Sequence, residues 1–481
     1  MVTTLVSALA AFMALGVSVF PVVNAEYDIS TRQAAIDSSR TLAYDLMTIY
    51  KGNQSGQIPG LLPGPPSSRT TEGVYWWWQG GALMGTMVDY YHYTGDDTYN
   101  HVVTEGLLWQ AGPNNDYMPP NATAELSNDD QCQWAISAML AAENGFPNPP
   151  KGSAQWLDLA NAVYQSQVRR WDQEEKSDVC GGGLRWQVPP TNVGYDYKNS
   201  ASTGCFFNLA SRLARYTGNA TYAASAEKAW DWLVAVKLVD ATTGAVADGA
   251  RTSTNCSTVN TAQFSLNAGY ILEGSAFLYN YTNGTETWKD RTNTLATAIL
   301  KTFFKGEVAY EVACEPKHEM CTSDMLMYKG FLHRWLAVVS QLMPTLEATF
   351  SSMLQKSAAA AVAQCTGGKS GRECGFYWTE GKYVSTGGTA SSGAGEQMDV
   401  LAAVLSTLVG GVSAPATANS ATGTVSGNPA AGNGTTTTGG GGNATSTAPP
   451  SSTSSSAAVY MGASGVLMSA LVGLGALAVA A

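Results

Sequence analysis

A turn that recurs along the chain constrains the fold more than any other feature of the sequence. At each occurrence a glycine is followed four residues later by an aromatic residue, and the glycines are 57, 66 and 66 residues apart. The four pairs are Gly95 and Tyr99, Gly152 and Trp156, Gly218 and Tyr222, and Gly284 and Trp288. A glycine that ends one helix, before a polar residue that caps the next, is typical of a tight helix–helix turn. The period of about 60 residues therefore predicts a series of helical hairpins.

Apolar residues recur with helical periodicity in twelve segments of the body, which spans residues 26–412. Their approximate ranges are 30–50, 75–93, 97–110, 128–144, 154–170, 204–216, 220–238, 262–281, 286–303, 323–342, 345–363 and 394–410. Six hairpins that close on themselves make an all-α (α/α)6 toroid, with the even-numbered helices inside and the odd-numbered helices outside. The alternative is an open α-solenoid of the same hairpins. We favour the closed ring because the unusual residues of the chain gather on one rim.

That rim is defined by the connections between helices. The even-numbered helices follow long connections, whereas the odd-numbered ones follow short glycine turns, so the long connections share one face. Long loops in a compact domain are usually functional. The notable segments on this face are Trp76-Trp77-Trp78-Gln79, Ser127-Asn128-Asp129-Asp130, Cys180 to Trp186, Lys198-Asn199-Ser200 and Asp248-Gly249.

Both ends of the chain carry targeting signals. An apolar run ends at Val23-Asn24-Ala25, which predicts a secretory signal peptide over residues 1–25. Residues 413–456 are rich in Ser, Thr, Gly and Ala and predict an unstructured stalk. Residues 457–481 are apolar, and no charged side chain follows Asp399. This pattern predicts a GPI-attachment tail that is removed, which would leave the protein on the outer face of the plasma membrane and in the cell wall.

Glycosylation and cysteine usage agree with secretion. Eight sequons occur, at Asn53, Asn121, Asn219, Asn255, Asn280, Asn283, Asn433 and Asn443. All eight cysteines lie in the body, and an even number of cysteines in an oxidising compartment predicts disulfides. We expect the short loops Cys314–Cys321 and Cys365–Cys374 to be closed, while the pairing of the other four cysteines stays open.

The charge balance narrows the class of ligand. The net charge is −11 and only 13% of residues are charged, which argues against nucleic acid and anionic lipid as partners. The 13 tryptophans suit stacking on sugar rings, so we expect a neutral, polar substrate. The sequence contains no CxxC pair and no histidine cluster, so it predicts no metal site, and we expect no cofactor. The histidines at positions 92, 101, 318 and 333 are scattered, and we expect them to be structural.

Asp129 and Asp130 are the strongest catalytic candidates. Cleavage of a glycosidic bond by the usual route needs one ionised and one protonated carboxyl group. Two adjacent acids at a helix start can supply both, because the helix dipole favours the first charge and that charge holds the proton of the second. The alternative is that they are ordinary first-turn acids behind an N-cap, since Ser127 and Asn128 precede them. Gln131, Gln133 and Trp134 after the pair favour the functional interpretation.

Further residues of the rim are predicted to bind substrate. The three consecutive tryptophans cannot all face one core from a helix, so at least one of these rings is expected to line the cleft. The glycines at 181–183 would let the backbone approach a ligand closely. The predicted substrate-binding residues are Trp76, Trp77, Gln79, Trp134, Arg185, Trp186, Asn199 and Asp248.

Several stretches resemble the fungal, GPI-anchored branch of glycoside hydrolase family 76, the mannan endo-1,6-α-mannosidase-like proteins. They include WWWQGGALMGTMVDYY, LSNDDQCQWAISAMLAAE, CGGGLRWQ and KNSASTGCFFNLASRLARYTGNATY, and the resemblance covers residues 26–410. It implies an (α/α)6 fold and retention of configuration on α-1,6-mannosides, with Asp129 as nucleophile and Asp130 as acid/base. It also implies transfer of GPI-anchored proteins, through their core glycan, to β-1,6-glucan of the wall.

Some alternatives stay open at this stage. Hydrolysis and transglycosylation share their first half-reaction, so the sequence does not separate them, and it does not show which aspartate attacks. A catalytically silent, GPI-anchored mannan-binding or adhesion protein is the rival from another class. The presence of both Asp129 and Asp130 disfavours that rival, because a binding protein needs no proton donor at a scissile bond.

Overall fold

The computed structural model describes residues 27–63, 75–122, 126–177, 179–386 and 393–420. The predicted signal peptide, the predicted GPI tail and most of the predicted stalk lie outside these residues. Within them no helix is long and apolar enough to cross a membrane.

Twelve α-helices occur in the described part of the chain, one in each of the twelve predicted segments. They are α1 (Arg32–Ile49), α2 (Trp77–Thr94), α3 (Asn100–Trp109), α4 (Asn128–Glu143), α5 (Trp156–Lys176), α6 (Ser200–Thr217), α7 (Ala220–Ala235), α8 (Ser265–Tyr281), α9 (Glu286–Thr302), α10 (Tyr328–Leu342), α11 (Pro344–Val362) and α12 (Ala394–Ser406). The segment predicted from residue 323 begins instead with a 3-10 turn, Met325–Met327, before α10.

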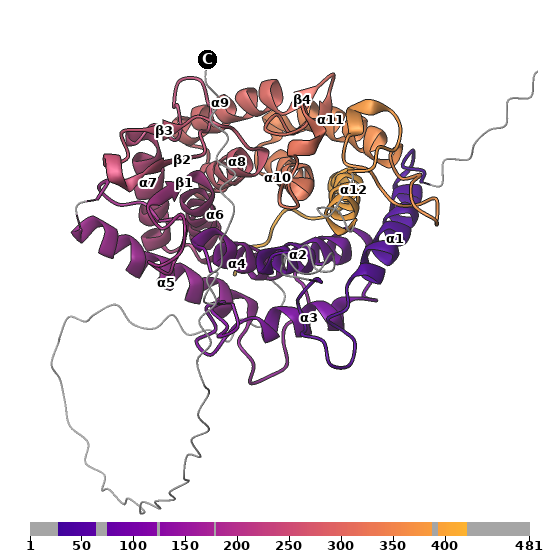
Figure 1. Ribbon diagram of the computed structural model, residues 1–481, viewed down its shortest axis with the longest axis horizontal. Coiled ribbons are helices and arrows are strands. Elements are labelled where there is room, and N and C mark those ends of the chain that lie inside the picture. Colours follow the sequence, from indigo (N-terminus) through magenta and orange to yellow (C-terminus); the bar gives the residue numbers. More distant parts are fainter. Residues whose placement is uncertain (1–26, 64–74, 123–125, 178, 387–392, 421–481) are drawn as a thin grey trace, which may run out of the picture. The chain divides into compact units, whose positions relative to one another are not determined.

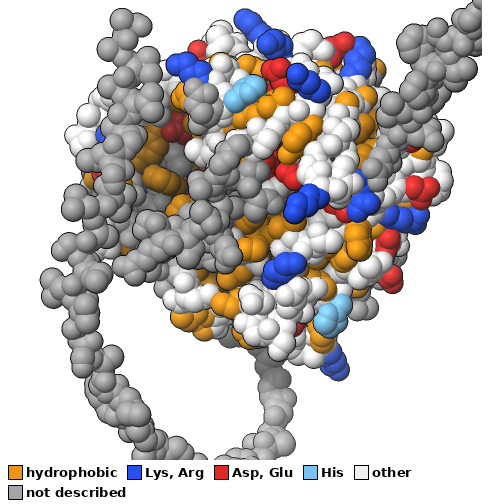
Figure 2. All heavy atoms as spheres, turned by 45° about the vertical axis from the view of Figure 1, so that its right-hand side comes forward, with side chains coloured by type: hydrophobic (Ala, Val, Ile, Leu, Met, Phe, Trp, Pro, Cys, Tyr) orange, Lys and Arg blue, Asp and Glu red, His pale blue; other side chains and the backbone are white. Residues whose placement is uncertain are grey.

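The even-numbered helices form an inner ring and the odd-numbered helices an outer one (Figure 1). Each inner helix packs against the next, from α2 through α4, α6, α8 and α10 to α12, and α12 packs back against α2. The ring is therefore closed, which confirms the (α/α)6 toroid and excludes the open solenoid. On the face seen in Figure 2, acidic, basic and apolar side chains are interspersed.

Burial patterns follow this arrangement. Inner helix α8 is buried without interruption over residues 265–278, as expected for a helix with neighbours on every side. Outer helix α9 buries one stripe with helical spacing: Trp288, Thr292, Leu295, Ala296 and Ile299. The aromatic residue of the repeated turn is thus the first anchor of that stripe.

The glycines of the repeated turn adopt the backbone conformation that the turn requires. Gly95 and Gly218 both have φ of 72° and end α2 and α6, where their N–H groups donate to the Tyr91 and Ala214 carbonyls. Gly152 and Gly284 have φ of 98° and 84°. Residues with a side chain rarely adopt positive φ, so glycine is the natural choice at each reversal.

Two small sheets were not predicted from the sequence. Strands β1 (Tyr197–Asn199), β2 (Gly249–Arg251) and β3 (Val259–Asn260) form an antiparallel sheet in that order, and β4 (Phe304–Lys305) pairs with β5 (Val308–Ala309). In the first sheet Asn199 lies opposite Gly249. The sheet therefore brings together the connections that precede α6 and α8.

Four disulfides close the cysteine set. The predicted pairs Cys314–Cys321 and Cys365–Cys374 are confirmed. The other two, Cys132–Cys205 and Cys180–Cys256, join residues 73 and 76 positions apart. The first links α4 to α6, three residues after Asp129.

The folded body extends beyond the boundary expected at residue 412. Ala416 N–H donates to the carbonyl of Glu143 at 2.8 Å, and Ala418 N–H donates to that of Tyr216 at 2.9 Å. These carbonyls lie at the C-terminal ends of α4 and α6. Residues 413–420 therefore pack on the rim opposite the start of the inner helices.

Candidate active site

The N-terminal ends of the inner helices meet on one rim. Trp78 Nε1 of α2 donates to Asp324 Oδ1, just before α10, at 3.0 Å. Ala394 N–H of α12 donates to the Tyr75 hydroxyl, just before α2, at 2.8 Å. The long connections therefore converge as the sequence predicted. Because helix N-termini carry partial positive charge, this rim favours acidic groups.

The acid pair lies on this rim, in the first turn of α4. Ser127 is the N-cap, and its hydroxyl accepts from Asp130 N–H at 3.1 Å. Asp129 and Asp130 are partly exposed, whereas Asn128 and Gln131 on either side are buried. The two carboxyl groups thus face the mouth of the ring.

The two carboxyl groups differ in electrostatic environment. Burial raises the pKa of Asp129, and side-chain hydrogen bonds from Ser127 and Asn199 oppose this rise. Burial and the charge of Asp129 raise the pKa of Asp130 well above its usual value. The pKa of Asp130 is thus raised more strongly than that of Asp129, so Asp130 is the member of the pair that keeps its proton to the higher pH, as the acid of a glycosidase does.

Asn199 contacts the pair directly, and Asp248 belongs to the connection that pairs with the strand of Asn199. Asn199 Nδ2 donates to Asp129 Oδ2 at 3.4 Å. The Asp248 carboxylate accepts from the Tyr197 hydroxyl at 2.7 Å and from Asn267 Nδ2 at 3.4 Å. Burial raises the pKa of Asp248, and these hydrogen bonds oppose the rise. Both residues lie where the sequence placed them.

Asp324 is a further carboxyl group near the acid pair that sequence reasoning missed. Burial raises its pKa to about 6, the hydrogen bond from Trp78 opposes this, and the charge of Asp129 adds to it. Its own charge contributes to the raised pKa of Asp130. A signal was available, because Asp324 lies at the start of the predicted segment 323–342, as Asp129 lies at the start of the segment 128–144.

The tryptophans divide between the mouth and the core. Trp76 is 39% exposed at the start of α2, and Trp78 faces Asp324. Trp77 instead stacks on Trp134 with ring centroids 5.4 Å apart and donates to Gln110 at 2.9 Å. The expected substrate contact of Trp134 is therefore wrong, since Trp134 is completely buried between Trp77 and Tyr117, whereas Trp77 is partly exposed and its contact stays a prediction. Both rings fill the space between α2, α3 and α4.

Gln79 is a structural residue rather than a substrate contact. It is fully buried, its Oε1 accepts from Trp76 N–H at 2.7 Å, and its Nε2 donates to the Ser323 carbonyl at 3.0 Å. It therefore ties the start of α2 to the connection that carries Asp324. The prediction placed it on the correct rim but gave it the wrong role.

Arg185 also points away from a substrate. Its Nε forms an ion pair with Glu174 at 2.7 Å, and its guanidinium lies over the Tyr195 ring. The adjacent Trp186 is 37% exposed, and its carbonyl accepts from Asn128 N–H at 2.8 Å. Trp76 and Trp186 are thus the two half-exposed tryptophans of this rim, and Trp186 is bound to the start of α4 through Asn128.

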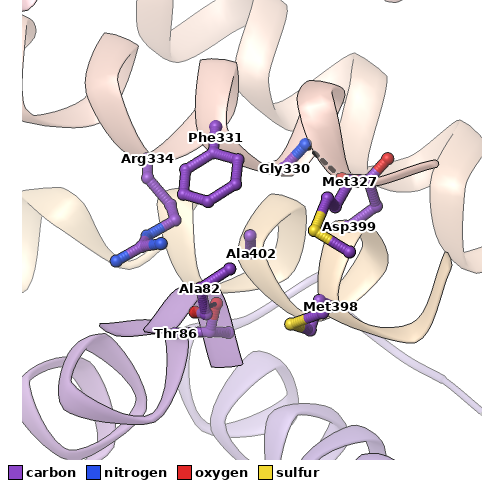
Figure 3. Close-up of a pocket in the computed structure, with 9 residues that line it drawn as sticks. All are labelled: Ala82, Thr86, Met327, Gly330, Phe331, Arg334, Met398, Asp399 and Ala402. Atoms are coloured by element: carbon purple, nitrogen blue, oxygen red, sulfur yellow. Dashed lines mark hydrogen bonds between the residues drawn. The ribbon is translucent and has the colours of Figure 1, made fainter. Parts of the chain in front are cut away.

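The centre of the ring is closed beneath this rim. Figure 3 shows a small cavity there between α2, α10 and α12, lined by residues that include Phe331, Arg334 and Asp399. Gly330 N–H donates to Asp399 Oδ1 at 2.6 Å. The cavity has room for about one water molecule, so a sugar ring does not fit in it. In the described ranges no group of three or more His, Cys, Asp or Glu side chains could hold a metal ion.

A closed (α/α)6 ring whose rim carries two adjacent carboxyl groups of unequal pKa defines a glycosidase. The family model described as Glycosyl hydrolase family 76 matches residues 35–419. The chain therefore belongs to glycosyl hydrolase family 76.

Curated fungal proteins and solved structures agree. The chain is 40% identical to mannan endo-1,6-alpha-mannosidase DCW1 of Saccharomyces cerevisiae over 85% of this chain and 86% of that protein. It is 35% identical to mannan endo-1,6-alpha-mannosidase DFG5 of the same yeast, covering 80% of each chain.

A crystal structure of Dfg5 from Chaetomium thermophilum in complex with glucosamine matches with a TM-score of 0.80 and 54% identity, over 84% of this chain and 97% of that chain. An inactive variant of an alpha-1,6-mannanase from Salegentibacter sp., in complex with alpha-1,6-mannotetrose, matches with a TM-score of 0.60 and 18% identity, over 78% and 98% of the two chains. The second likeness shows the fold alone.

Proposed function

We propose that this protein is a retaining, endo-acting α-1,6-mannosidase or transglycosidase. The observation that carries the proposal is the adjacency of Asp129 and Asp130 on the rim, together with a pKa that is raised more strongly at Asp130 than at Asp129, so that Asp130 keeps its proton to a higher pH. Asp129 Oδ1 has no hydrogen-bond partner in the described part of the chain, so one oxygen of this carboxyl group is not committed to another protein group. The names of the DCW1 and DFG5 relatives support the mannoside substrate.

In the proposed reaction Asp129 attacks the anomeric carbon while Asp130 donates its proton to the departing glycosidic oxygen. A covalent mannosyl–Asp129 intermediate forms with the first inversion. Asp130, now a carboxylate, takes a proton from an incoming hydroxyl group that attacks the same carbon and releases Asp129. Two inversions give retention. A water molecule yields hydrolysis, whereas a sugar hydroxyl yields transfer.

The natural donor in this proposal is the mannose-containing core glycan of a GPI-anchored protein, and the acceptor is β-1,6-glucan of the cell wall. The glucosamine bound by the Chaetomium protein supports the donor, because glucosamine is a component of GPI glycans. In the proposal the half-exposed rings of Trp76 and Trp186 stack on sugar units of the substrate. Endo-acting cleavage needs such binding on both sides.

The proposal places the enzyme at the outer face of the plasma membrane and in the wall, held by a GPI anchor. The support is compositional, from the apolar tail of residues 457–481 and the absence of charge after Asp399. Release of the protein from membranes by phosphatidylinositol-specific phospholipase is the corresponding test.

The Asp129→Asn and Asp130→Asn variants test the chemistry. Asn preserves shape but can neither attack nor donate the proton, so each should lower kcat by roughly 10²-fold or more while the fold persists. The measurement is product analysis with a synthetic α-1,6-mannoside donor and a β-1,6-glucan acceptor, together with thermal unfolding.

Asp158→Asn is the matched control for this experiment. Asp158 is also a first-turn acid, but it belongs to α5, which begins on the opposite rim. It should retain full activity. Wild-type turnover in either Asn variant of the pair would remove that residue from the mechanism. Glycan binding without turnover in the wild-type protein would favour the rival, a silent mannan-binding or adhesion protein.

A further inference from the structure

The residue that precedes Asp129 is held by the rim segment Arg185-Trp186. Asn128, which precedes Asp129, donates its N–H to the carbonyl of Trp186 and its Nδ2 to that of Arg185, both at 2.8 Å. On the other edge Trp186 N–H donates to the Tyr197 carbonyl at 2.7 Å. The segment therefore connects the start of α4 to β1, which ends with Asn199.

A buried lysine and a partly buried arginine lie at the crossing of this segment with β1. Arg185 and Lys198 form an antiparallel backbone bridge. Lys198 has a completely buried side chain, and its Nζ donates to the carbonyls of Val179 at 2.9 Å and Gly182 at 2.6 Å. Lys198 thereby also holds the glycine loop that the sequence singled out.

A single carboxylate faces both cations. Glu174, near the end of α5, lies 2.7 Å from Arg185 Nε through Oε1 and 3.0 Å from Lys198 Nζ through Oε2. Burial lowers the pKa of Lys198, Glu174 opposes this change, and the charge of Arg185 adds to it. Without Glu174 the charges of Arg185 and Lys198 would repel each other with little solvent to screen them. This repulsion would weaken the backbone bridge between the rim segment and β1.

We propose that Glu174 is a positioning residue for the reaction, which holds Asn128 and Asn199 around Asp129 through Arg185 and Lys198. This inference rests on the proposed role of Asp129 as nucleophile. Glu174 has no part in bond making: its effect reaches Asp129 only through the two neighbouring asparagines.

The pH profile separates positioning from a merely structural role. The side chain of Asn199 donates to Asp129 and lowers the pKa of Asp129. Titratable groups around Asp129 are Asp130 on its own helix, Asp324 before α10, Tyr270 on α8 and Tyr328 on α10. The ion pairs of Glu174 in the described structure are instead with Arg185 and Lys198. If Asn199 moves away, the pKa of Asp129 rises, and activity is lost at a higher pH on the acid side.

The experiment compares Glu174→Gln with Glu175→Gln. Both residues are on α5 and both form an ion pair, but Glu175 pairs with Lys228 at 2.7 Å, away from the rim segment. For E174Q we expect the acid limb of kcat/KM to shift upward by roughly half to one pH unit. We also expect kcat to fall by about tenfold with KM nearly unchanged. E175Q should keep the wild-type profile.

A folded E174Q protein with wild-type kcat and an unshifted acid limb overturns the proposal, even if its melting temperature is lower. If E174Q does not fold, Arg185→Gln replaces it with the same measurements, because it removes one of the two linkages and keeps the ion pair of Lys198. The Asp129→Asn variant distinguishes a failure of the proposed function from a failure of the positioning role of Glu174. If that variant is active, the proposed function fails; if it is inactive while E174Q and R185Q behave as wild type, only the positioning role fails.

Discussion

Asp129 and Asp130 are adjacent in sequence but have different partners, and this difference gives them different chemistry. Asp129 receives a hydrogen bond from Asn199 at the start of the next inner helix, whereas Asp130 feels the charge of Asp129 and of Asp324. The neighbouring charge alone would not decide which member keeps the proton, because repulsion between two acids is mutual. The hydrogen bond from Asn199, which reaches Asp129 and not Asp130, is one of the contacts that make the two groups unequal.

Asp324→Asn tests the further carboxyl group near the acid pair. Above pH 6 the Asp324 carboxyl group is largely ionised, and its charge helps to raise the pKa of Asp130. Removing that charge lowers the pKa of Asp130, so Asp130 loses its proton, and with it the ability to act as the acid, at a lower pH. We expect the alkaline limb of kcat/KM to move down by roughly one pH unit.

The control for this variant is Asp196→Asn. The Asp196 side chain is 51% exposed and pairs with Arg251 at 2.9 Å, so this substitution should leave the pH profile unchanged. An alkaline limb in D324N that coincides with that of the wild-type enzyme would show that Asp324 does not influence the proton donor.

At the scale of elements, the helices were predictable and the strands were not. The sequence signals of a helix are local, because its cap, its apolar period and its terminal glycine lie within about 20 residues of one another. The strands are two or three residues long, and β1 pairs with a strand far away in the sequence, since Asn199 lies opposite Gly249. Such short segments have no period of their own. The sheet that holds Asn199 next to the connection of Asp248 therefore could not be seen in the sequence.

The same distinction applies to the candidate site. Asp129, Asp130, Asn199, Trp186 and Asp248 were placed on the correct rim by the rule that long connections precede even-numbered helices. That rule gives the rim to which a residue belongs but not the direction of its side chain. Trp77 and Trp134 face a neighbouring helix, and Arg185 faces Glu174, because of contacts between distant segments.

Gly218→Ala tests the turn chemistry. Gly218 has φ of 72° and open space where a Cβ atom would lie, so the cost of the substitution is the backbone strain alone. We expect the free energy of unfolding to fall by about 1 kcal/mol. Urea denaturation measures this change.

Gly410→Ala is the matched substitution. Its Cβ would also meet no atom within 4 Å, and Gly410 lacks a positive φ. It should be neutral or stabilise the protein by up to about 1 kcal/mol. Equal losses in the two variants would contradict the strain argument.

At the scale of the molecule, buried ion pairs link the inner helices to one another below the rim. Arg212 on α6 pairs with Glu143 on α4 at 2.5 Å and with Glu273 on α8 at 3.7 Å. Arg334 on α10 pairs with Asp89 on α2 at 2.5 Å. These pairs add charged contacts to the apolar packing between inner helices. Their geometry is specific, so they favour one register of the helices.

Glu273→Gln tests how this network depends on pH. Burial raises the pKa of Glu273 to about 7, against the opposing effects of Arg212 and Asn208, whereas an unfolded chain has a glutamate pKa near 4.3. The folded state therefore keeps a proton that the unfolded state releases. The contribution of the protonated Glu273 to the free energy of unfolding is fully present below about pH 4.3. It is lost as the pH rises through 7, with a slope of up to about 1.4 kcal/mol per pH unit.

The glutamine that replaces Glu273 in this variant does not titrate. The stability of the wild-type protein relative to E273Q should therefore fall between pH 5 and pH 7. Chemical denaturation of both proteins across this range measures it. Parallel stability curves would mean that Glu273 has the same proton occupancy in the folded and unfolded states.

The docking of residues 413–420 sets the side of the ring on which the described chain ends. Ala416 and Ala418 are bound at the far ends of α4 and α6, and a 16-residue helix such as α4 is about 24 Å long. The described chain therefore ends about that distance from the acid pair, on the opposite side of the ring. The described body thus ends on the rim that does not carry Asp129 and Asp130, so the segment that leads toward the proposed anchor starts on the side of the ring away from the chemistry.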